Sequence, residues 1–475
     1  MGPDQFEGVR VQSLRGIEGT IEREKGMKDP RCESCAEVYS RRSFLRVGSL
    51  SFFGVSLSQY LALQNLMAET SDTNSRPVAK AQSCILLWLE GGPSHVDTFD
   101  PKPGSSFKPI ATNVPGIQVS ELLPRLAKHV DKLAIIRSLH TEENNHAQAT
   151  YYAMTGHKLN PVTKFPCLGS MMVKEMKARN EVPPYVMVSR VHSCAFFAFQ
   201  DAFSPAFLGP DYDPFIIDSS EQGDFSLPDL SLPKSLTPQA IDYRKALLTV
   251  VDQHLRQKEA IADFAKMDVF RAQALRMILS PEVKQAFDLS QETAKTKDPY
   301  GHHRFGQSVL LARRLVEAGA RFVTASGYSG GDWDTHSNND DLHRDKLTPP
   351  LDQALSALLE DLQQRGLLES TMVIVMGEFG RTPYHNPNKG RDHWNDCWSM
   401  VLAGGGIRGG QVVGASDEKG AYVADNMVTM GDVFATIYKA LGIDWTKTLM
   451  SPVGRPVYIA NSIGDVPGTP IKELI

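Results

Sequence analysis

Carboxylates and imidazoles, the side chains that bind transition metals, follow several apolar runs of this sequence. The runs cover residues 84–89, 321–326 and 371–376, and polar groups stand shortly after each of them. The candidate ligands are Glu90, Asp332, Asp334, His336, Glu378 and, in a later loop, His393. Oxygen and nitrogen donors together suit zinc, manganese or iron better than calcium. We therefore predict a divalent metal site. A single Asp-x-x-x-His pair would more often be a solvated turn, but groups after three separate runs are harder to explain in that way.

The elements that must position these residues form a regular series. Short apolar runs alternate with helical patterns, which predicts an α/β fold with a mainly parallel sheet. Strands are predicted at 84–89, 132–137, 184–189, 321–326, 371–376 and 399–403, and helices at 146–155, 305–318, 347–364 and 432–441. Ligands of open α/β sheets bind at the carboxyl ends of the strands. The candidate ligands should therefore meet at one edge of the sheet.

Composition narrows the class of protein. The chain has 475 residues, of which 41% are hydrophobic and 22% charged, which is ordinary for a soluble globular protein with a large core. The net charge of -5 is small and favours neither nucleic acid nor an acidic membrane surface as a partner. Six cysteines are too few for a disulfide scaffold, and Cys32 and Cys35 lack the second pair that a zinc site needs.

The first 82 residues are interpreted as an export signal followed by a linker. Arg41 and Arg42 precede an uncharged run at 47–63, which is typical of a twin-arginine signal. The run is too short and polar for a stable membrane span. A buried first helix is the alternative. We expect the twin-arginine export machinery as a partner and a periplasmic or extracellular location. Residues 83–475 are predicted to form one domain, with 195–290 as an insertion or lid.

Several motifs of the predicted domain occur together in a known superfamily. They are Gly91-Gly92-Pro93-Ser94, Asp97, Asp100-Pro101-Lys102-Pro103, Trp333-Asp334-Thr335-His336, Gly377-Glu378-Phe379-Gly380-Arg381-Thr382-Pro383 and Gly390-Arg391-Asp392-His393-Trp394. The set resembles the alkaline phosphatase and sulfatase superfamily, and most closely a twin-arginine-exported branch with a sulfatase-like domain of unknown function. The resemblance runs from Ser83 to the end of the chain. It implies a three-layer alkaline-phosphatase-like fold with helices on both faces of the sheet, and metal-dependent hydrolysis of a phosphate or sulfate ester, carbohydrate esters included.

The resemblance also implies how the metal ligands are shared out. One position is complete, with Asp332 or Asp334, His336 and His393. The other departs from the superfamily, because Glu90 and Glu378 replace aspartates and Phe379 replaces a histidine.

His146 stands where the superfamily has its nucleophile. Four roles for it remain open: a ligand of a remodelled second metal position with Glu90 and Glu378, a covalent nucleophile, a general base, or a helix cap that leaves the second position empty.

Three arginines and two tryptophans carry further hypotheses. Arg137, Arg381 and Arg391 are candidates to bind a phosphate or sulfate group, or alternatively to pair with carboxylates across the loops. Trp333 and Trp394 could stack on a sugar, although aromatic packing is the commoner role. The missing nucleophile leaves a rival function open: a non-catalytic, decayed hydrolase that binds carbohydrate or a partner at the cell surface.

Overall fold

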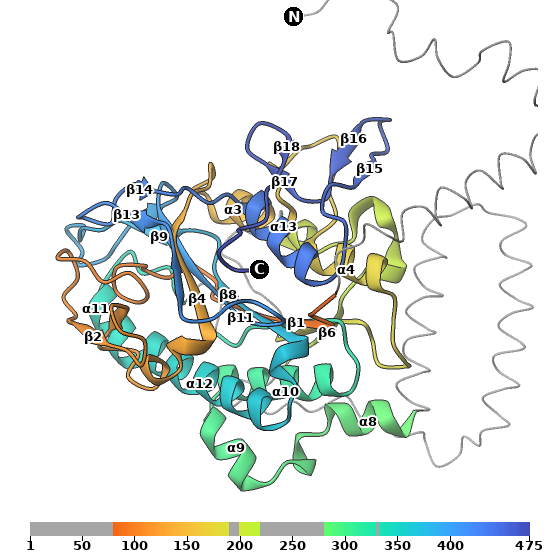
Figure 1. Cartoon of the computed structure of the whole chain (residues 1–475), viewed down its shortest axis with the longest axis horizontal. Coiled ribbons are helices and arrows are strands. Elements are labelled where there is room, and N and C mark those ends of the chain that lie inside the picture. The colour runs from red at the N-terminus through yellow and green to blue at the C-terminus, as the bar shows by residue number, and fades with distance from the viewer. Residues whose placement is uncertain (1–78, 190–198, 219–279, 329–331) are drawn as a thin grey trace, which may run out of the picture. The chain divides into compact units, whose positions relative to one another are not determined.

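The computed structural model describes residues 79–189, 199–218, 280–328 and 332–475 (Figure 1). The predicted twin-arginine signal lies outside the described residues, as do Cys32 and Cys35. The same holds for most of the predicted insertion at 195–290. Among the described helices, none has the length and apolar character needed to cross a membrane.

An eight-stranded sheet forms the centre of the fold, in the order β12-β4-β11-β8-β1-β7-β5-β6. Its strands are β1 (Ser83–Trp88), β4 (Leu133–Leu139), β5 (Tyr185–Val188), β6 (Phe215–Ile217), β7 (Phe322–Ala325), β8 (Thr371–Met376), β11 (Trp398–Gly404) and β12 (Gln411–Val413). Strand β11 is antiparallel to β4 and β8, and the other pairings within this sheet are parallel. The predicted mainly parallel sheet is confirmed.

Helices cover both faces of the sheet (Figure 1). One face carries α3 (His146–Thr155), α4 (Leu168–Met176) and α13 (Met430–Ala440), and the other carries α8 (Pro281–Phe287), α9 (Ala294–Tyr300), α10 (Arg304–Glu317) and α12 (Thr348–Gln364). Strand β1 shows why its sequence is apolar throughout. Leu86 and Trp88 belong to one core, while Ile85 and Leu87 belong to the other. A strand buried on both faces reads as a continuous apolar run.

Local sequence sets the limits of α3, the helix that begins with His146. Asn145 caps it, since its side chain accepts a hydrogen bond from the Ala147 N–H, and Gly156 ends it with a φ of 73°. Only glycine adopts that conformation without cost, so it is a frequent helix terminator. The predicted range 146–155 is confirmed.

Short elements complete the described fold. They are β2 (Pro109–Ala111), β3 (Gln118–Ser120), α5 (Phe199–Ala202), α11 (Asn339–Leu342), β9 (Gly380–Arg381), β10 (His393–Trp394), β13 (Ala415–Ser416), β14 (Val423–Asp425), β15 (Thr448–Met450), β16 (Pro456–Tyr458), β17 (Asn461–Ser462) and β18 (Val466–Pro467). The described ends of the predicted insertion belong to the core: β6 pairs with β5, and α8 buries Val283 and Phe287. Sequence periodicity did not identify β6, β12 or α4.

Candidate functional site

Five of the candidate residues meet at the carboxyl ends of the parallel strands. His146 starts α3 after β4, Asp334 and His336 follow β7, Glu378 follows β8, and His393 lies in β10. The predicted convergence of these side chains at one sheet edge is therefore what the structure shows.

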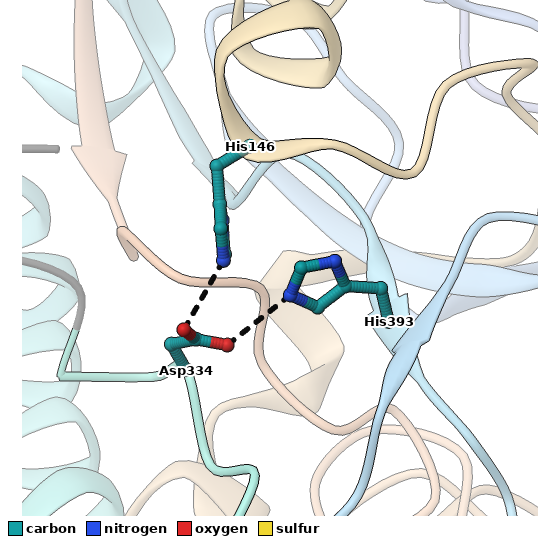
Figure 2. Close-up of side chains that lie close together, drawn as sticks. All are labelled: His146, Asp334 and His393. Carbon is teal, nitrogen blue, oxygen red and sulfur yellow. Dashed lines mark hydrogen bonds and ion pairs between the residues drawn. The ribbon is translucent and has the colours of Figure 1, made fainter. Parts of the chain in front are cut away.

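Asp334 is the centre of the cluster (Figure 2). Its Oδ1 lies 3.1 Å from His336 Nε2 and 3.3 Å from His393 Nε2, and its Oδ2 lies 3.2 Å from His146 Nε2. The Arg381 guanidinium donates to the same Oδ1. Ligand atoms of His146, Asp334 and His393 all lie within 4.8 Å of one another. One carboxylate thus connects three imidazoles and a guanidinium.

Two of these imidazoles are oriented as metal ligands are. His336 Nδ1 donates a hydrogen bond to Asp392 at 2.7 Å, and His393 Nδ1 donates one to the Asn144 carbonyl, also at 2.7 Å. Because both partners accept hydrogen bonds, each neutral ring carries its proton on Nδ1 and its lone pair on Nε2, and the two Nε2 atoms lie 3.0 Å apart.

The spacing of the donor atoms fits a metal. The Asp334 Oδ1, His336 Nε2 and His393 Nε2 atoms form a triangle with edges of 3.0, 3.1 and 3.3 Å. Two neighbouring nitrogens on a tetrahedral zinc, each about 2.0–2.1 Å from it, would lie about 3.3 Å apart. The donor set present therefore suits one divalent ion.

His146 lies between two carboxylates. Its Nδ1 is 2.6 Å from Glu378 Oε1 and its Nε2 is 3.2 Å from Asp334, and Glu378 also accepts from the Gly91 N–H at 3.0 Å. Burial lowers the pKa of His146, but hydrogen bonds to Asp334 and Glu378 and their negative charges outweigh burial and raise this pKa to about 9. The two carboxylates thus favour the protonated form of the ring.

Asp334 stays ionised for the complementary reason. Burial raises its pKa, but the hydrogen bond from His146 and the positive charges of Arg381 and His146 hold the pKa of Asp334 well below its ordinary value.

Phe379 forms an apolar wall where the resemblance places a histidine ligand. Its ring centroid lies 5.0 Å from that of His146 and 4.5 Å from that of His393, and it is fully buried. Gly92 permits this packing. It has a φ of +82°, and a Cβ there would lie 2.6 Å from the Phe379 ring.

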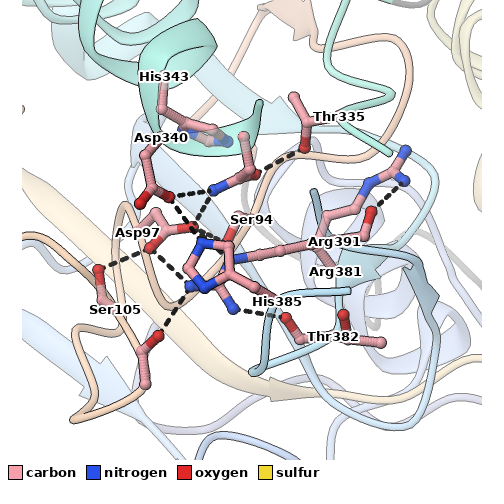
Figure 3. A network of polar contacts seen from close by, with 12 residues as sticks. Ser94, Asp97, Ser105, Thr335, Asp340, His343, Arg381, Thr382, His385 and Arg391 are labelled. Carbon is pink, nitrogen blue, oxygen red and sulfur yellow. Dashed lines mark hydrogen bonds and ion pairs between the residues drawn. The ribbon is translucent and has the colours of Figure 1, made fainter. Parts of the chain in front are cut away.

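Arg391 forms a buried ion pair in place of the predicted anion contact (Figure 3). Its Nε and Nη2 donate to Asp97 at 2.8 and 3.2 Å, and its Nη1 donates to the Thr382 carbonyl at 2.9 Å. Arg391 and Asp97 are both fully buried. Because each guanidinium nitrogen is already bound to protein, Arg391 supports the loops, which is the alternative that the sequence left open.

Arg381 and Arg137 are also bound to protein. Arg381 donates to the Gly92 carbonyl at 3.0 Å as well as to Asp334, so it reaches the cluster. Arg137 donates to the Phe99 carbonyl at 2.9 Å. Among the described contacts of the three arginines, that of Arg381 with Asp334 reaches a carboxylate of the cluster, whereas Arg391 and Arg137 pair with Asp97 and Asp100.

One family model matches nearly the whole described domain. The model, described as a protein of unknown function (DUF1501), covers residues 81–475. The chain belongs to the DUF1501 family. We found no match among curated proteins.

Solved structures that match this DUF1501 chain include phosphate- and sulfate-ester enzymes. One is a sulfatase from Pseudoalteromonas sp., with 14% identity, coverage of 81% of this chain and 71% of that chain, and a TM-score of 0.36. Another is alkaline phosphatase from the Antarctic bacterium TAB5, with 13% identity, coverage of 69% of this chain and 93% of that chain, and a TM-score of 0.32. A third is the C-terminal periplasmic domain of EcEptC from Escherichia coli, with 8% identity, coverage of 77% of this chain and 84% of that chain, and a TM-score of 0.37. All are members of the alkaline phosphatase and sulfatase superfamily. Because these TM-scores are below 0.5, the similarity to these structures carries no argument about function.

The remaining candidates in this DUF1501 chain lie beside the cluster. Asp334 supplies the carboxylate of the close group, and Asp332 is outside it. Glu90 is also outside this group; it is buried, and its backbone carbonyl accepts from the Trp333 N–H at 3.1 Å. Trp333 is fully buried against aromatic neighbours, so it packs in the core and does not face a sugar. Trp394 donates to the Ala421 carbonyl at 2.6 Å.

Sequence reasoning missed the groups that orient the two imidazoles. Asp392 was noted only as part of a motif, although it directly precedes His393 and binds His336. Its position inside a ligand motif was a usable signal, because ligating histidines commonly bind a carboxylate through the other nitrogen. Asn144 contributes a backbone carbonyl, for which a sequence carries no signal.

Proposed function

We propose that this protein is an exported, metal-dependent hydrolase of phosphate or sulfate esters, carbohydrate esters included. The observation that carries the proposal is the triangle of Asp334 Oδ1, His336 Nε2 and His393 Nε2, with edges of 3.0 to 3.3 Å. Zinc, manganese and iron all accept such donors.

The cluster has the parts that ester hydrolysis requires. A divalent ion held by Asp334, His336 and His393 would supply positive charge at an ester oxygen and a bound water with a pKa near ~7. His146 adds a second positive charge 3.2 Å from Asp334, which suits an anionic ester. We assign His146, whose Nε2 lies 3.2 Å from Asp334, the role of proton donor to the leaving oxygen.

Export is a separate part of the proposal. Its support is the pair Arg41-Arg42 ahead of the run at 47–63, in residues outside those described. Delivery to the periplasm or the cell exterior by the twin-arginine machinery would place the site where exported carbohydrate esters occur.

The test compares three histidine-to-alanine variants in metal content and activity. His336→Ala and His393→Ala should each lose most bound metal after dialysis, because two remaining protein ligands are too few to hold zinc tightly. His385→Ala is the matched control, since His385 contacts Asp340 at 2.8 Å and not the cluster. Metal is measured by mass spectrometry, and hydrolysis is measured with nitrophenyl phosphate and nitrophenyl sulfate.

Two results would contradict the proposal. Full metal content in both His336→Ala and His393→Ala would remove the metal assignment. Stoichiometric metal in the wild-type protein without hydrolysis of any ester in a broad phosphate and sulfate panel would favour the non-catalytic, carbohydrate- or partner-binding alternative.

A further inference from the structure

The loop of residues 386–390 lies directly against the backbone of His336, one of the three proposed metal ligands. Lys389 forms an antiparallel β-bridge with Ser337, the residue that follows His336. Gly390 makes the closest approach, since a Cβ there would lie 1.9 Å from the His336 carbonyl carbon. Any side chain at position 390 would therefore push the loop away from His336.

Asn386 uses every hydrogen-bonding position of its side-chain amide. Its Oδ1 accepts from the backbone N–H groups of Asn388 and Gly390, each at 2.9 Å. Its Nδ2 donates to the His336 carbonyl and to Asp392 Oδ1, each at 3.0 Å. A side-chain amide has two donor hydrogens and an oxygen with two lone pairs, so these four partners also fix which way the group points.

The loop itself explains only half of this arrangement. An asparagine oxygen that accepts from N–H groups a few residues later is the ordinary contact of an Asx turn, and here it closes the loop. The two donor contacts leave the loop. They reach His336, 50 positions away in the chain, and Asp392, which also accepts from His336 Nδ1 at 2.7 Å. One amide thus holds both the backbone and the ring partner of the same candidate metal ligand.

The exposure of the His336–Asp392 pair explains why this support is needed. The two side chains are 45% and 52% exposed, so packing does not hold them in place. Exposed ion pairs are weak, because holding two side chains in one geometry costs entropy and water screens their charges. Asn386 restrains the same Asp392 oxygen from a second direction. This restraint helps to keep His336 Nε2 at 3.0 Å from His393 Nε2, a separation that fits a shared ion.

We propose that Asn386 is a positioning residue of the metal site and sets the affinity of that site for its ion. It is not among the proposed ligands, and it acts through the His336 carbonyl and the Asp392 carboxylate. Replacing a group that orients a ligating histidine typically lowers metal affinity by about 10- to 100-fold. The inference rests on the proposed function in one respect, namely that Asp334, His336 and His393 bind a divalent ion.

The test measures zinc affinity and a cobalt spectrum in variants of the full-length protein. Asn386→Asp keeps an oxygen for the two loop N–H groups, but it replaces the donor nitrogen with an oxygen that faces Asp392 and the His336 carbonyl. Its Kd for Zn²⁺, measured by competition with a chelator, should rise about 10- to 100-fold. The visible absorption of bound Co²⁺, which depends on ligand geometry, should change as well. The melting temperature of the metal-free protein should stay close to that of the wild type, because the contacts that close the loop are retained.

Three further variants make the result specific. Asn388→Ala is the matched control: Asn388 is exposed on the same loop and binds Asn386 through its backbone N–H, so the Kd for Zn²⁺ should not change. Asn386→Ser, whose hydroxyl can close the turn more weakly, should also weaken zinc binding and takes the place of Asn386→Asp if that variant does not fold. In an Asp392→Ala background, Asn386→Asp should weaken zinc binding by a much smaller factor, because one of the two groups on which Asn386 acts is already gone.

The outcomes separate this role from the proposed function. A raised Kd and a changed Co²⁺ spectrum in Asn386→Asp, with Asn388→Ala unaltered, support the positioning role. An unchanged Kd in Asn386→Asp, an equal loss in Asn388→Ala, or the same loss with and without Asp392 overturns that role and leaves the metal site intact. A wild-type protein that binds neither Zn²⁺ nor Co²⁺ refutes the proposed metal site itself, and the role of Asn386 falls with it.

Discussion

Removing the carboxylate of Asp97 should both destabilise the protein and loosen the proposed metal site. Asp97 accepts hydrogen bonds from Arg391, from Ser94 at 2.6 Å and from Asn339 at 2.8 Å (Figure 3). Asn339 in turn accepts from the Thr335 hydroxyl at 2.7 Å, and the Arg391 N–H donates to the Thr335 carbonyl at 2.8 Å. Asp97 therefore connects the loop of Asp334 and His336 to the strand of His393.

The size of the effect follows from burial. Breaking a fully buried ion pair by removing one partner costs about 3–5 kcal/mol, since it leaves an uncompensated charge. Asp97→Ala should therefore lower the free energy of unfolding by that amount at neutral pH, measured by urea denaturation. Asp131→Ala is the matched control. The carboxylate of Asp131 lies 3.2 Å from the Lys132 ammonium, and the Asp131 side chain is 47% exposed. Ion pairs at the surface contribute about 1 kcal/mol or less to the free energy of unfolding.

A double-mutant cycle tests the reasoning directly. Replacing both Asp97 and Arg391, by alanine and methionine, removes both charges, so the double variant should lose less stability than the sum of the single variants. Additive losses, or a cost of Asp97→Ala no larger than that of Asp131→Ala, would refute the ion-pair account. Unchanged metal affinity in Asp97→Ala would refute the link to the cluster.

The same pair predicts the response to acid. Burial raises the pKa of Asp97, but Arg391 and the hydrogen bonds to this carboxylate lower the pKa to about 2. A folded-state pKa below the unfolded value of 3.8 contributes stability above that value, which is lost as the pH falls toward 2. The contribution is about 2 kcal/mol, at about 1.4 kcal/mol per pH unit. In Asp97→Ala, the free energy of unfolding should therefore fall less between neutral pH and pH 2 than it does in the wild-type protein.

The remaining predictions concern His146 and export. In protein dialysed free of metal, NMR titration should give His146 a pKa near 9, and Glu378→Gln should lower that pKa, because the substitution removes one of the two carboxylates bound to the ring. Because the pKa of His146 is raised in the folded state, its protonation stabilises the folded protein fully below pH 6.5, and this stabilisation is lost as the pH rises through about 9. Glu378→Gln should therefore lower the free energy of unfolding more at pH 6 than at pH 10. An unchanged His146 pKa in this variant would contradict the assigned contacts. Replacing Arg41 and Arg42 with lysine should leave the protein in the cytoplasm by cell fractionation, whereas continued export would rule out the twin-arginine route.

Local patterns determined the fold class and the place of the site. The buried strands are continuous apolar runs because both faces of each strand are covered, and β8 was predicted with its observed limits, 371–376. The limits of α3 were also predicted, because the Asn145 cap and the Gly156 terminator act over a few residues. Because ligands of α/β sheets bind at the carboxyl ends of the strands, the candidate ligands were expected after strand ends, and Asp334 and His336 follow β7 while Glu378 follows β8.

Tertiary structure decided what each polar residue does. Asp332 and Asp334 are equivalent in a motif, but Asp334 is the one placed against three imidazoles. Arg391 could have bound an anion, but a partner 294 positions away in the chain, Asp97, occupies its guanidinium. The charge of His146 likewise depends on Glu378, 232 positions away. Electrostatic roles depend on distances between groups that are remote in sequence and on their exclusion from water, and neither quantity is present in a local pattern.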